Sequence, residues 1–194
     1  MIRQHIVLKA LISTILLVAG HGPAYAEPVA DADRVAIDFR RTTLVVSDID
    51  ASLAFYRDAL GMQVIYDHMI RTPREAKTDD EAERSRRLVF LRANDNYVGV
   101  LGLLQYTKPV TPPAHQGDTP FSTGSAVLLF NAHDLDSTFV KARSVLGTRV
   151  LYEPTRTEYP SYDGGGKIAV MVSVLTDPDG FVVELNQLLT DPLE

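Results

Sequence analysis

An internal repeat is the feature that most constrains the fold of this chain. The segment DIDASLAFYRDALGMQVIYD, from Asp48 to Asp67, aligns without gaps with DLDSTFVKARSVLGTRVLYE, from Asp134 to Glu153, at an offset of 86 residues. The identical pairs are Asp48/Asp134, Asp50/Asp136, Arg57/Arg143, Leu60/Leu146, Gly61/Gly147, Val64/Val150 and Tyr66/Tyr152. Such a repeat indicates one supersecondary unit that occurs twice, so one local fold must account for both halves.

Each copy predicts a strand, a helix and a second strand. The preceding segments TTLVVS and AVLLFN are apolar and rich in β-branched residues, which is typical of strands. Asp48 or Asp50, and Asp134 or Asp136, are suitable N-cap residues, while Gly61 and Gly147 are suitable C-terminal caps. Helical spacing predicts one buried stripe per helix, made of Leu53, Phe55 or Tyr56 and Leu60 in the first and of Phe139, Ala142 and Leu146 in the second.

Two further strand candidates follow each copy, which completes a βαβββ plan in both halves. They are RLVFLRA and YVGVLGLLQY in the first half, and KIAVMVSVL and FVVELNQL in the second. The turn Asp177-Pro178-Asp179-Gly180 has the composition of a hairpin turn. We therefore expect a first module over residues 40–106, a proline-rich linker over 107–124 and a second module over 125–189.

These segments resemble the glyoxalase, bleomycin-resistance and extradiol-dioxygenase superfamily, also called vicinal oxygen chelate proteins. TTLVVSDIDASLAFYRDALGMQVIYD is similar to the opening strand and helix of that family, and DPDGFVVELNQ is similar to its closing hairpin. The resemblance implies an α+β fold in which two tandem βαβββ modules pair into a curved mixed-sheet cup, forming one domain over residues 40–189.

The resemblance also implies a divalent metal in the cup, held by a histidine on the first strand and a glutamate on the last strand of the modules. Three of these positions carry Arg41, Gly102 and Val127, and only Glu184 remains as a ligand. An arginine stays protonated and has no free lone pair, and a single carboxylate is too few for such a site. We therefore expect no cofactor. Zinc, nickel, manganese or iron is the alternative, with Glu184 and His68 as candidate ligands.

Strand alternation places Glu184 in the cup, with Val182 and Asn186, while Phe181, Val183 and Leu185 face a helix. By the same alternation Arg41 shares a face with Thr43. We expect an Arg41–Glu184 ion pair in place of the metal. The pair either acts on a ligand or only neutralises two partly buried charges, and an exposed Glu184 on an edge strand is a third alternative.

The segment EPTRTEYPSYDGGGK is a candidate lid over the cup. Tyr159 or Tyr162 could stack on a ligand if the loop is a lid, and a plain connection is the alternative.

The first residues follow the plan of an export signal. Arg3 and Lys9 precede the apolar run from Ala10 to Gly20, and Ala24-Tyr25-Ala26 is a small-x-small cleavage site. We expect removal of residues 1–26, which leaves a short segment, 27–39, before the first module; an uncleaved anchor is the alternative. The signal contains two of the 19 basic residues and none of the 25 acidic ones, so the mature chain carries a net charge of −8. That charge argues against nucleic acid or an anionic membrane as partner.

Two classes of function fit these features. The first is a secreted or periplasmic protein that binds a small molecule bearing an anionic or carbonyl group, without the usual metal, through Arg41, Thr43, Asn186 and the two tyrosines. The second is an enzyme of the glyoxalase, lyase, isomerase or dioxygenase kind, metal-dependent or using Glu184 as a general base. An interaction module with a vestigial cup is a weaker third option. Both a monomer and a homodimer are compatible with the repeat.

Overall fold

The computed structural model describes residues 30–110, 112, 121–161 and 166–189. The expected export signal and Tyr162 therefore lie outside the described residues. Contacts divide the chain into two units, residues 1–34 and 35–194. In the first unit the described residues form a single short 3-10 helix, η1 (Asp31–Asp33). No helix among the described residues is long and apolar enough to cross a membrane.

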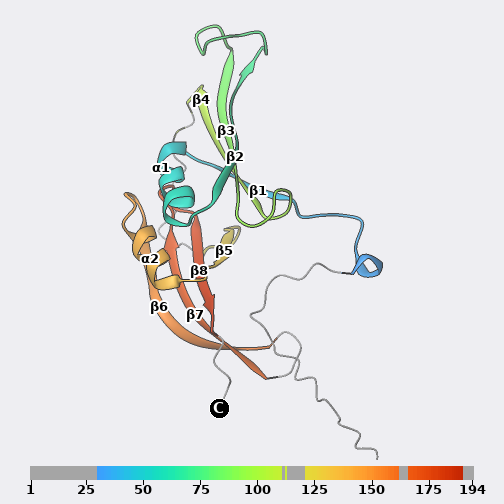
Figure 1. Cartoon of the computed structure of the whole chain (residues 1–194). Helices are drawn as coiled ribbons and strands as arrows, with labels where there is room; N and C mark the ends of the chain where they lie inside the picture. Colours follow the sequence, from blue (N-terminus) through green and yellow to red (C-terminus); the bar gives the residue numbers. More distant parts are fainter. Residues whose placement is uncertain (1–29, 111, 113–120, 162–165, 190–194) are drawn as a thin grey trace, which may run out of the picture. The chain divides into compact units, whose positions relative to one another are not determined.

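The first module contains four strands and one helical segment (Figure 1). The elements are β1 (Arg41–Val45), α1 (Ile49–Leu53) continued by the π-helical η2 (Ala54–Ala59), β2 (Gln63–Thr72), β3 (Arg84–Arg92) and β4 (Val100–Lys108). They form a sheet of order β1-β4-β3-β2, in which β1 runs parallel to β4 and the other pairs are antiparallel. The βαβββ plan predicted from the sequence is thus present.

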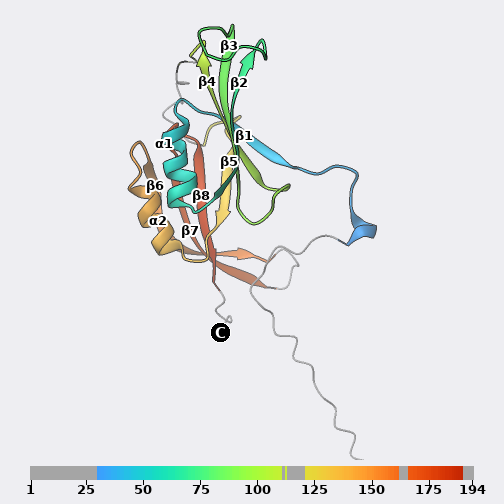
Figure 2. The ribbon, with the colours of Figure 1, turned by 45° about the horizontal axis from the view of Figure 1, so that its top comes forward.

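The second module repeats this plan. Its elements are β5 (Val127–Asn131), α2 (Leu135–Arg143), β6 (Arg149–Pro160), β7 (Lys167–Thr176) and β8 (Val182–Leu188). The sheet order is β5-β8-β7-β6, with β5 parallel to β8. The two four-stranded mixed sheets confirm the predicted α+β class with two tandem modules. Both views show α1 and α2 on the same side of the sheets (Figures 1 and 2).

The helix ends follow the predicted capping residues. The Asp48 side chain accepts hydrogen bonds from the backbone N–H groups of Asp50 and Ala51, and Asp134 accepts one from Ser137. Gly61 and Gly147 have φ angles of 81° and 90°, a left-handed conformation that favours glycine after a helix. The expected burial of Leu146 is wrong, because α2 ends at Arg143 and the Leu146 side chain is 93% exposed.

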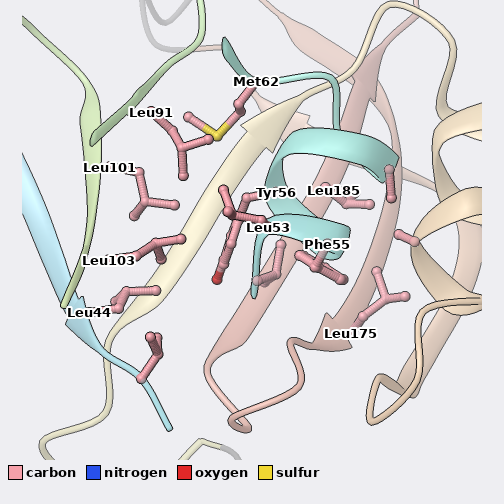
Figure 3. Packing of buried hydrophobic residues seen from close by; sticks show 14 of the residues in the cluster. Leu44, Leu53, Phe55, Tyr56, Met62, Leu91, Leu101, Leu103, Leu175 and Leu185 are labelled. Carbon is pink, nitrogen blue, oxygen red and sulfur yellow. The ribbon is translucent and has the colours of Figure 1, made fainter. Parts of the chain in front are cut away.

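A single apolar core joins the two modules. Figure 3 shows Leu44, Leu101 and Leu103 of the first sheet near Tyr56 and Leu53. The same cluster continues into the second module with its own helix and sheet residues, Leu135, Phe139, Ala142, Leu175, Val183 and Leu185. The rings of Tyr56 and Phe130 lie 6.3 Å apart between centroids, which is direct contact across the modules. The helical segment of the first module is therefore packed by both halves.

A polar contact reinforces this junction at the turn between β7 and β8. The Tyr56 hydroxyl donates to Asp177 Oδ2 at 2.9 Å, and both residues are fully buried. Asp179, two residues later, accepts from the backbone N–H of Ser47 at 2.9 Å. Burial raises the pKa of Asp177 to about 6, although the hydrogen bond from Tyr56 opposes the change. The turn thus holds the second module against the start of the first helix.

The charged segment between β2 and β3 is anchored to the sheet. This segment, residues 73–83, contains turns and bends and no helix. Arg71 forms an ion pair with Asp79 at 2.8 Å, and Lys108 Nζ donates to the Asp79 carbonyl oxygen at 2.9 Å. Ala82 is 2% exposed. These contacts favour a structural role for this segment.

Candidate functional site

Each sheet has one face that packs on a helix and one that does not, which we term the first and second open faces. In the first sheet the core residues Leu44, Val89, Leu91, Leu101 and Leu103 define the helix side. Alternation along β1 then places Arg41, Thr43 and Val45 on the open face, and all three are exposed. The predicted common face of Arg41 and Thr43 is confirmed.

The first open face carries positive charge and no carboxylate. Alternation and register assign to it Arg41, Thr43, Val45, Val100, Gly102, Leu104, Tyr106, Arg84, Arg86, Leu88, Phe90, Arg92, Gln63, Tyr66, His68, Ile70 and Thr72. None of these residues is Asp or Glu, although the chain has 25 acidic against 19 basic residues. This face therefore carries four arginines, Arg41, Arg84, Arg86 and Arg92, and an anion that approaches it meets no competing carboxylate.

Arg41 contacts an aromatic ring and no acid. Its guanidinium carbon lies 4.1 Å from the centroid of the Phe90 ring. Within the part of the chain that the structure describes, its guanidinium has neither a salt bridge nor a hydrogen bond. The predicted ion pair between Arg41 and Glu184 is therefore wrong. Arg41 is held by a cation–π contact, and its N–H groups remain available.

Gly102 allows the Arg41 side chain to reach Phe90 across β4. It lies on β4 between Thr43 of β1 and Phe90 of β3, to which it is paired on either side. A side chain from β1 can reach Phe90 only across β4, and a residue without a side chain leaves that space free. A Cβ atom at Gly102 would meet Thr43 Oγ1 at 2.7 Å. The position where the family resemblance implies a glutamate is thus occupied by neighbouring side chains.

A row of rings continues from Arg41 across the first open face. The ring centroids of Phe90 and Tyr66 are 4.8 Å apart with an interplanar angle of 23°, and His68 meets Tyr66 edge-on at 4.6 Å. We term Phe90, Tyr66 and His68 the aromatic row. The sequence reasoning singled out His68 and missed the other two. The alternation in QVIYDHMI and RLVFLRA places each ring on a face, but only the strand register makes them neighbours.

Glu184 lies on the second open face, as predicted from alternation. Val183 and Leu185 belong to the core, whereas Glu184 is half-buried between them. β8 is flanked by β5 and β7, so the alternative of an exposed glutamate on an edge strand is wrong. Asn186 Nδ2 donates to Glu184 Oε1 at 2.8 Å, and Asn186 is only 7% exposed. Asn186 therefore orients the carboxylate rather than presenting itself to a ligand.

Of the two tyrosines of the expected lid, only Tyr159 lies within the described residues. Tyr159 is a residue of β6, paired with Ile168 of β7, and is 42% exposed. Because Ile168 shares the alternation of Val174, which is opposite Glu184, Tyr159 belongs to the second open face. The strand continues to Pro160, so the loop interpretation is wrong for Tyr159. Tyr162, Gly164 and Gly165 lie outside the described residues.

The residues present do not fit a divalent metal at the family positions. Among the described residues, no three His, Cys, Asp or Glu side chains lie close enough together to hold a metal ion. Arg41 and Gly102 cannot act as side-chain ligands, and Val127 contributes only an apolar side chain. His68 contacts Tyr66, and no carboxylate shares its face. The donor set therefore consists of Glu184 alone, which is too few for a metal centre.

A shallow apolar pocket lies where the edge strands of the two sheets approach each other. It is lined by Phe39, Thr42 and residues 99–101 of the first module and by residues 128–130 of the second. None of the predicted site residues that the structure describes lines this pocket. Its side chains are mostly apolar, and Thr42 is the one polar side chain among the described residues that line it.

Comparisons with known proteins agree with this architecture. A glyoxalase family protein from Bacillus cereus is 14% identical, covers 82% of this chain and 99% of its own, and superposes with a TM-score of 0.61. The trypanothione-dependent glyoxalase I of Leishmania major is 20% identical, covers 78% of this chain and 87% of its own, and has a TM-score of 0.51. No curated protein sequence matches the chain. The model of the Glyoxalase/Bleomycin resistance protein/Dioxygenase superfamily matches residues 38–185, and the chain therefore belongs to that superfamily.

Proposed function

We propose that this protein binds a small organic molecule with a carboxylate or carbonyl group on the first open face, without a divalent metal at the family positions. The description of the superfamily joins enzymes with bleomycin resistance proteins, so membership is compatible with binding and with catalysis. The choice between them rests on the site, because a fold alone does not specify a function.

The observation that carries this proposal is that the Arg41 guanidinium is held by an aromatic ring and has no carboxylate partner among the described residues. The guanidinium is held over Phe90, 4.1 Å from the ring centroid, on a face without carboxylates. A guanidinium that is already oriented loses less side-chain entropy when it receives a carboxylate in a bidentate contact. In contrast, Arg57, Arg71 and Arg87 are each paired with an aspartate. Arg41 is thus a cation whose missing partner a ligand can supply.

Titration of the purified protein with acetate, pyruvate and benzoate tests the proposal. Binding is followed by the NMR shift of arginine Nε–H signals and by calorimetry. We expect at least one of these carboxylates to perturb the Arg41 signal, and Arg41→Gln to weaken binding about tenfold or more, as loss of a charged hydrogen bond predicts. The control is Arg149→Gln, an exposed arginine of β6. Equal binding by wild type and Arg41→Gln would exclude Arg41 as the receptor.

The metal-free part of the proposal has its own measurement. The donor set of Arg41, Gly102, Val127 and Glu184 supports it, because only the last residue can bind a cation. We expect carboxylate binding to be unchanged after treatment with a chelator and after addition of zinc, nickel, manganese or iron(II). One equivalent of tightly bound metal, together with loss of carboxylate binding in chelator, would overturn this part. The metal-dependent alternative would then hold.

The second candidate function is an enzyme in which Glu184 acts as a general base. The observation that favours it is the hydrogen bond from Asn186, which fixes one carboxylate oxygen and leaves Oε2 without a hydrogen-bond donor among the described residues. A half-buried, oriented carboxylate can accept a proton from carbon next to a carbonyl group. Proton exchange with solvent is the simplest reaction of this kind, because the proton lost is replaced by one from water and no oxidant is needed.

Exchange of the methyl protons of pyruvate in deuterium oxide tests this second candidate by NMR. A catalytic Glu184 predicts exchange that is faster than in buffer and that falls to the buffer rate in Glu184→Gln. Gln187→Glu is a matched control, since it adds a carboxylate to the same strand on the opposite alternation. Exchange at the buffer rate with wild-type protein would leave ligand binding as the function.

We further propose export, with cleavage after Ala26, on the strength of the basic start, the apolar run and the Ala-Tyr-Ala site. The mass of the protein recovered from an expressing bacterial host measures this directly. A mature chain that begins at Glu27 in the periplasmic fraction is the expected result. An intact N-terminus in the membrane fraction would support the alternative of an uncleaved anchor.

A further inference from the structure

The aromatic row has a defined geometry on the first open face. The centroid separation of Phe90 and Tyr66, 4.8 Å, equals the usual spacing of neighbouring strands, and their planes are within 23° of parallel. Side chains stand roughly perpendicular to a sheet, so the two rings stand upright side by side. Their outer edges point away from the sheet, with the Arg41 guanidinium beside Phe90 and His68 beside Tyr66.

The edges of aromatic rings carry partial positive charge, and their faces partial negative charge. The outer edges of Phe90 and Tyr66 thus favour the face of another flat ring laid across them. At one end of this surface is Arg41, whose N–H groups have no protein acceptor in the described part of the chain. At the other end is His68, which is exposed and can donate or accept a hydrogen bond.

We propose, on the basis of the function assigned above, that the ligand class is an aromatic or conjugated carboxylate. Its carboxylate accepts hydrogen bonds from Arg41, and its ring lies across the outer edges of Phe90 and Tyr66 with its far end at His68. The preference is for a flat ring over a saturated one of equal charge, because only a π-face matches the positive ring edges. Gly102 contributes because it has no side chain, so that the neighbouring side chains of β1 can extend over β4 toward Phe90.

The experiment compares 2-naphthoate with its fully saturated analogue, decahydronaphthalene-2-carboxylate, by calorimetry on the purified protein. The two ligands have the same charge and nearly the same size. We expect 2-naphthoate to bind about five- to tenfold more tightly, the range that aromatic edge-to-face contacts provide. In Tyr66→Leu the ratio of the two dissociation constants, saturated ligand over 2-naphthoate, should fall close to one. Binding of the saturated ligand should be kept, because the residue that receives the carboxylate is Arg41 and not Tyr66.

Tyr152→Leu is the matched control, since Tyr152 occupies the repeat position equivalent to Tyr66 and is 62% exposed. It should retain the wild-type ratio. Thermal unfolding confirms that each variant is folded, and the NMR shift of the Tyr66 ring protons on adding 2-naphthoate gives a second readout that needs no variant. Phe90→Leu should lower both affinities, since Phe90 also supports Arg41.

Two outcomes separate this inference from the proposed function. If both ligands bind wild type equally and both are lost in Arg41→Gln, the aromatic preference is overturned while carboxylate binding at Arg41 stands. If neither ligand binds, and Arg41→Gln is indistinguishable from wild type with all carboxylates tried, both proposals fail. A ratio that survives Tyr66→Leu also contradicts the inference, because the ring would then be recognised elsewhere.

Discussion

The Tyr56 hydroxyl donates a 2.9 Å hydrogen bond to the Asp177 carboxylate inside the junction of the two modules. Asp177 Oδ1 also accepts from the backbone N–H groups of Phe181 and Asp179, at 2.8 and 3.0 Å. Both side chains are fully buried, so no solvent replaces a contact that is removed. The closing hairpin of one module is thus tied to the helical segment of the other by a carboxylate that water does not reach.

Removing the hydroxyl of Tyr56 should destabilise the protein. Tyr56→Phe keeps the ring in the core but leaves Asp177 with one hydrogen bond fewer, and an unsatisfied buried partner costs about 1–3 kcal/mol. Urea unfolding measures the difference in the free energy of unfolding. Tyr106→Phe, at a tyrosine that is 36% exposed, provides the control and should change stability by less than about 0.5 kcal/mol. Equal effects of the two changes would show that the Tyr56 hydrogen bond contributes nothing.

The pKa of Asp177 predicts a specific dependence of stability on pH. Burial raises this pKa from 3.8 to about 6 in the folded protein. Between these values the folded state binds more protons than the unfolded state, so the contribution of Asp177 to stability is complete below about pH 4 and is lost as the pH rises through about 6. Two pKa units correspond to about 3 kcal/mol.

The difference in unfolding free energy between wild type and Asp177→Asn, followed from pH 4 to pH 8, isolates this effect. Asparagine keeps an oxygen for the two backbone N–H groups and does not ionise. Wild type should therefore lose stability relative to the variant as the pH rises, by up to about 3 kcal/mol. The comparison cancels the five histidines and those carboxylates, such as Asp67 beside Arg87, whose pKa is lowered. A difference that stays constant with pH would contradict a raised pKa at Asp177.

The architecture could be predicted from the sequence because its signals are local. Asp48 and Gly61 cap the first helical segment through groups within a few residues of themselves, and the repeat transfers the same reasoning to Asp134 and Gly147. Leu146 shows where local reasoning fails. Helical periodicity continues to it, but α2 ends at Arg143, and a side chain beyond the last turn no longer follows the buried stripe.

This difference at Leu146 is testable. Leu146→Ala should change the free energy of unfolding by less than about 0.5 kcal/mol, because the side chain is 93% exposed. Phe139→Ala, at a residue of the same helix that is 3% exposed, should cost about 3–5 kcal/mol through lost burial and the cavity left behind. Chemical denaturation of both variants gives the comparison. A cost above about 1 kcal/mol at Leu146 would indicate that it is buried after all, as its position in the repeat suggests.

The candidate site was only partly predictable. Alternation alone placed Glu184 and Arg41 on open faces, because the side-chain period of a strand is fixed. The partner of each residue depended on features that the sequence does not display. Arg41 lies over Phe90 because the register sets Gly102 opposite that ring, and Glu184 meets Asn186 on its own strand. The predicted Arg41–Glu184 ion pair joined residues of two different sheets. Periodicity along a strand does not say how two sheets are placed relative to each other.

The close approach of Gly102 and Thr43 can be measured by a double-mutant cycle. Gly102→Ala adds a Cβ atom that would lie 2.7 Å from Thr43 Oγ1, and we expect a loss of about 1–3 kcal/mol from this overpacking. Thr43→Ala removes that oxygen, so Gly102→Ala should cost less in the Thr43→Ala background, with a coupling energy of at least about 0.5 kcal/mol by urea unfolding. The cycle itself separates this clash from the general effect of losing a glycine, because that general effect is the same in both Thr43 backgrounds. Additive costs at positions 43 and 102 would mean that Thr43 does not fill the space above Gly102, and the family's glutamate position would then be open rather than occupied.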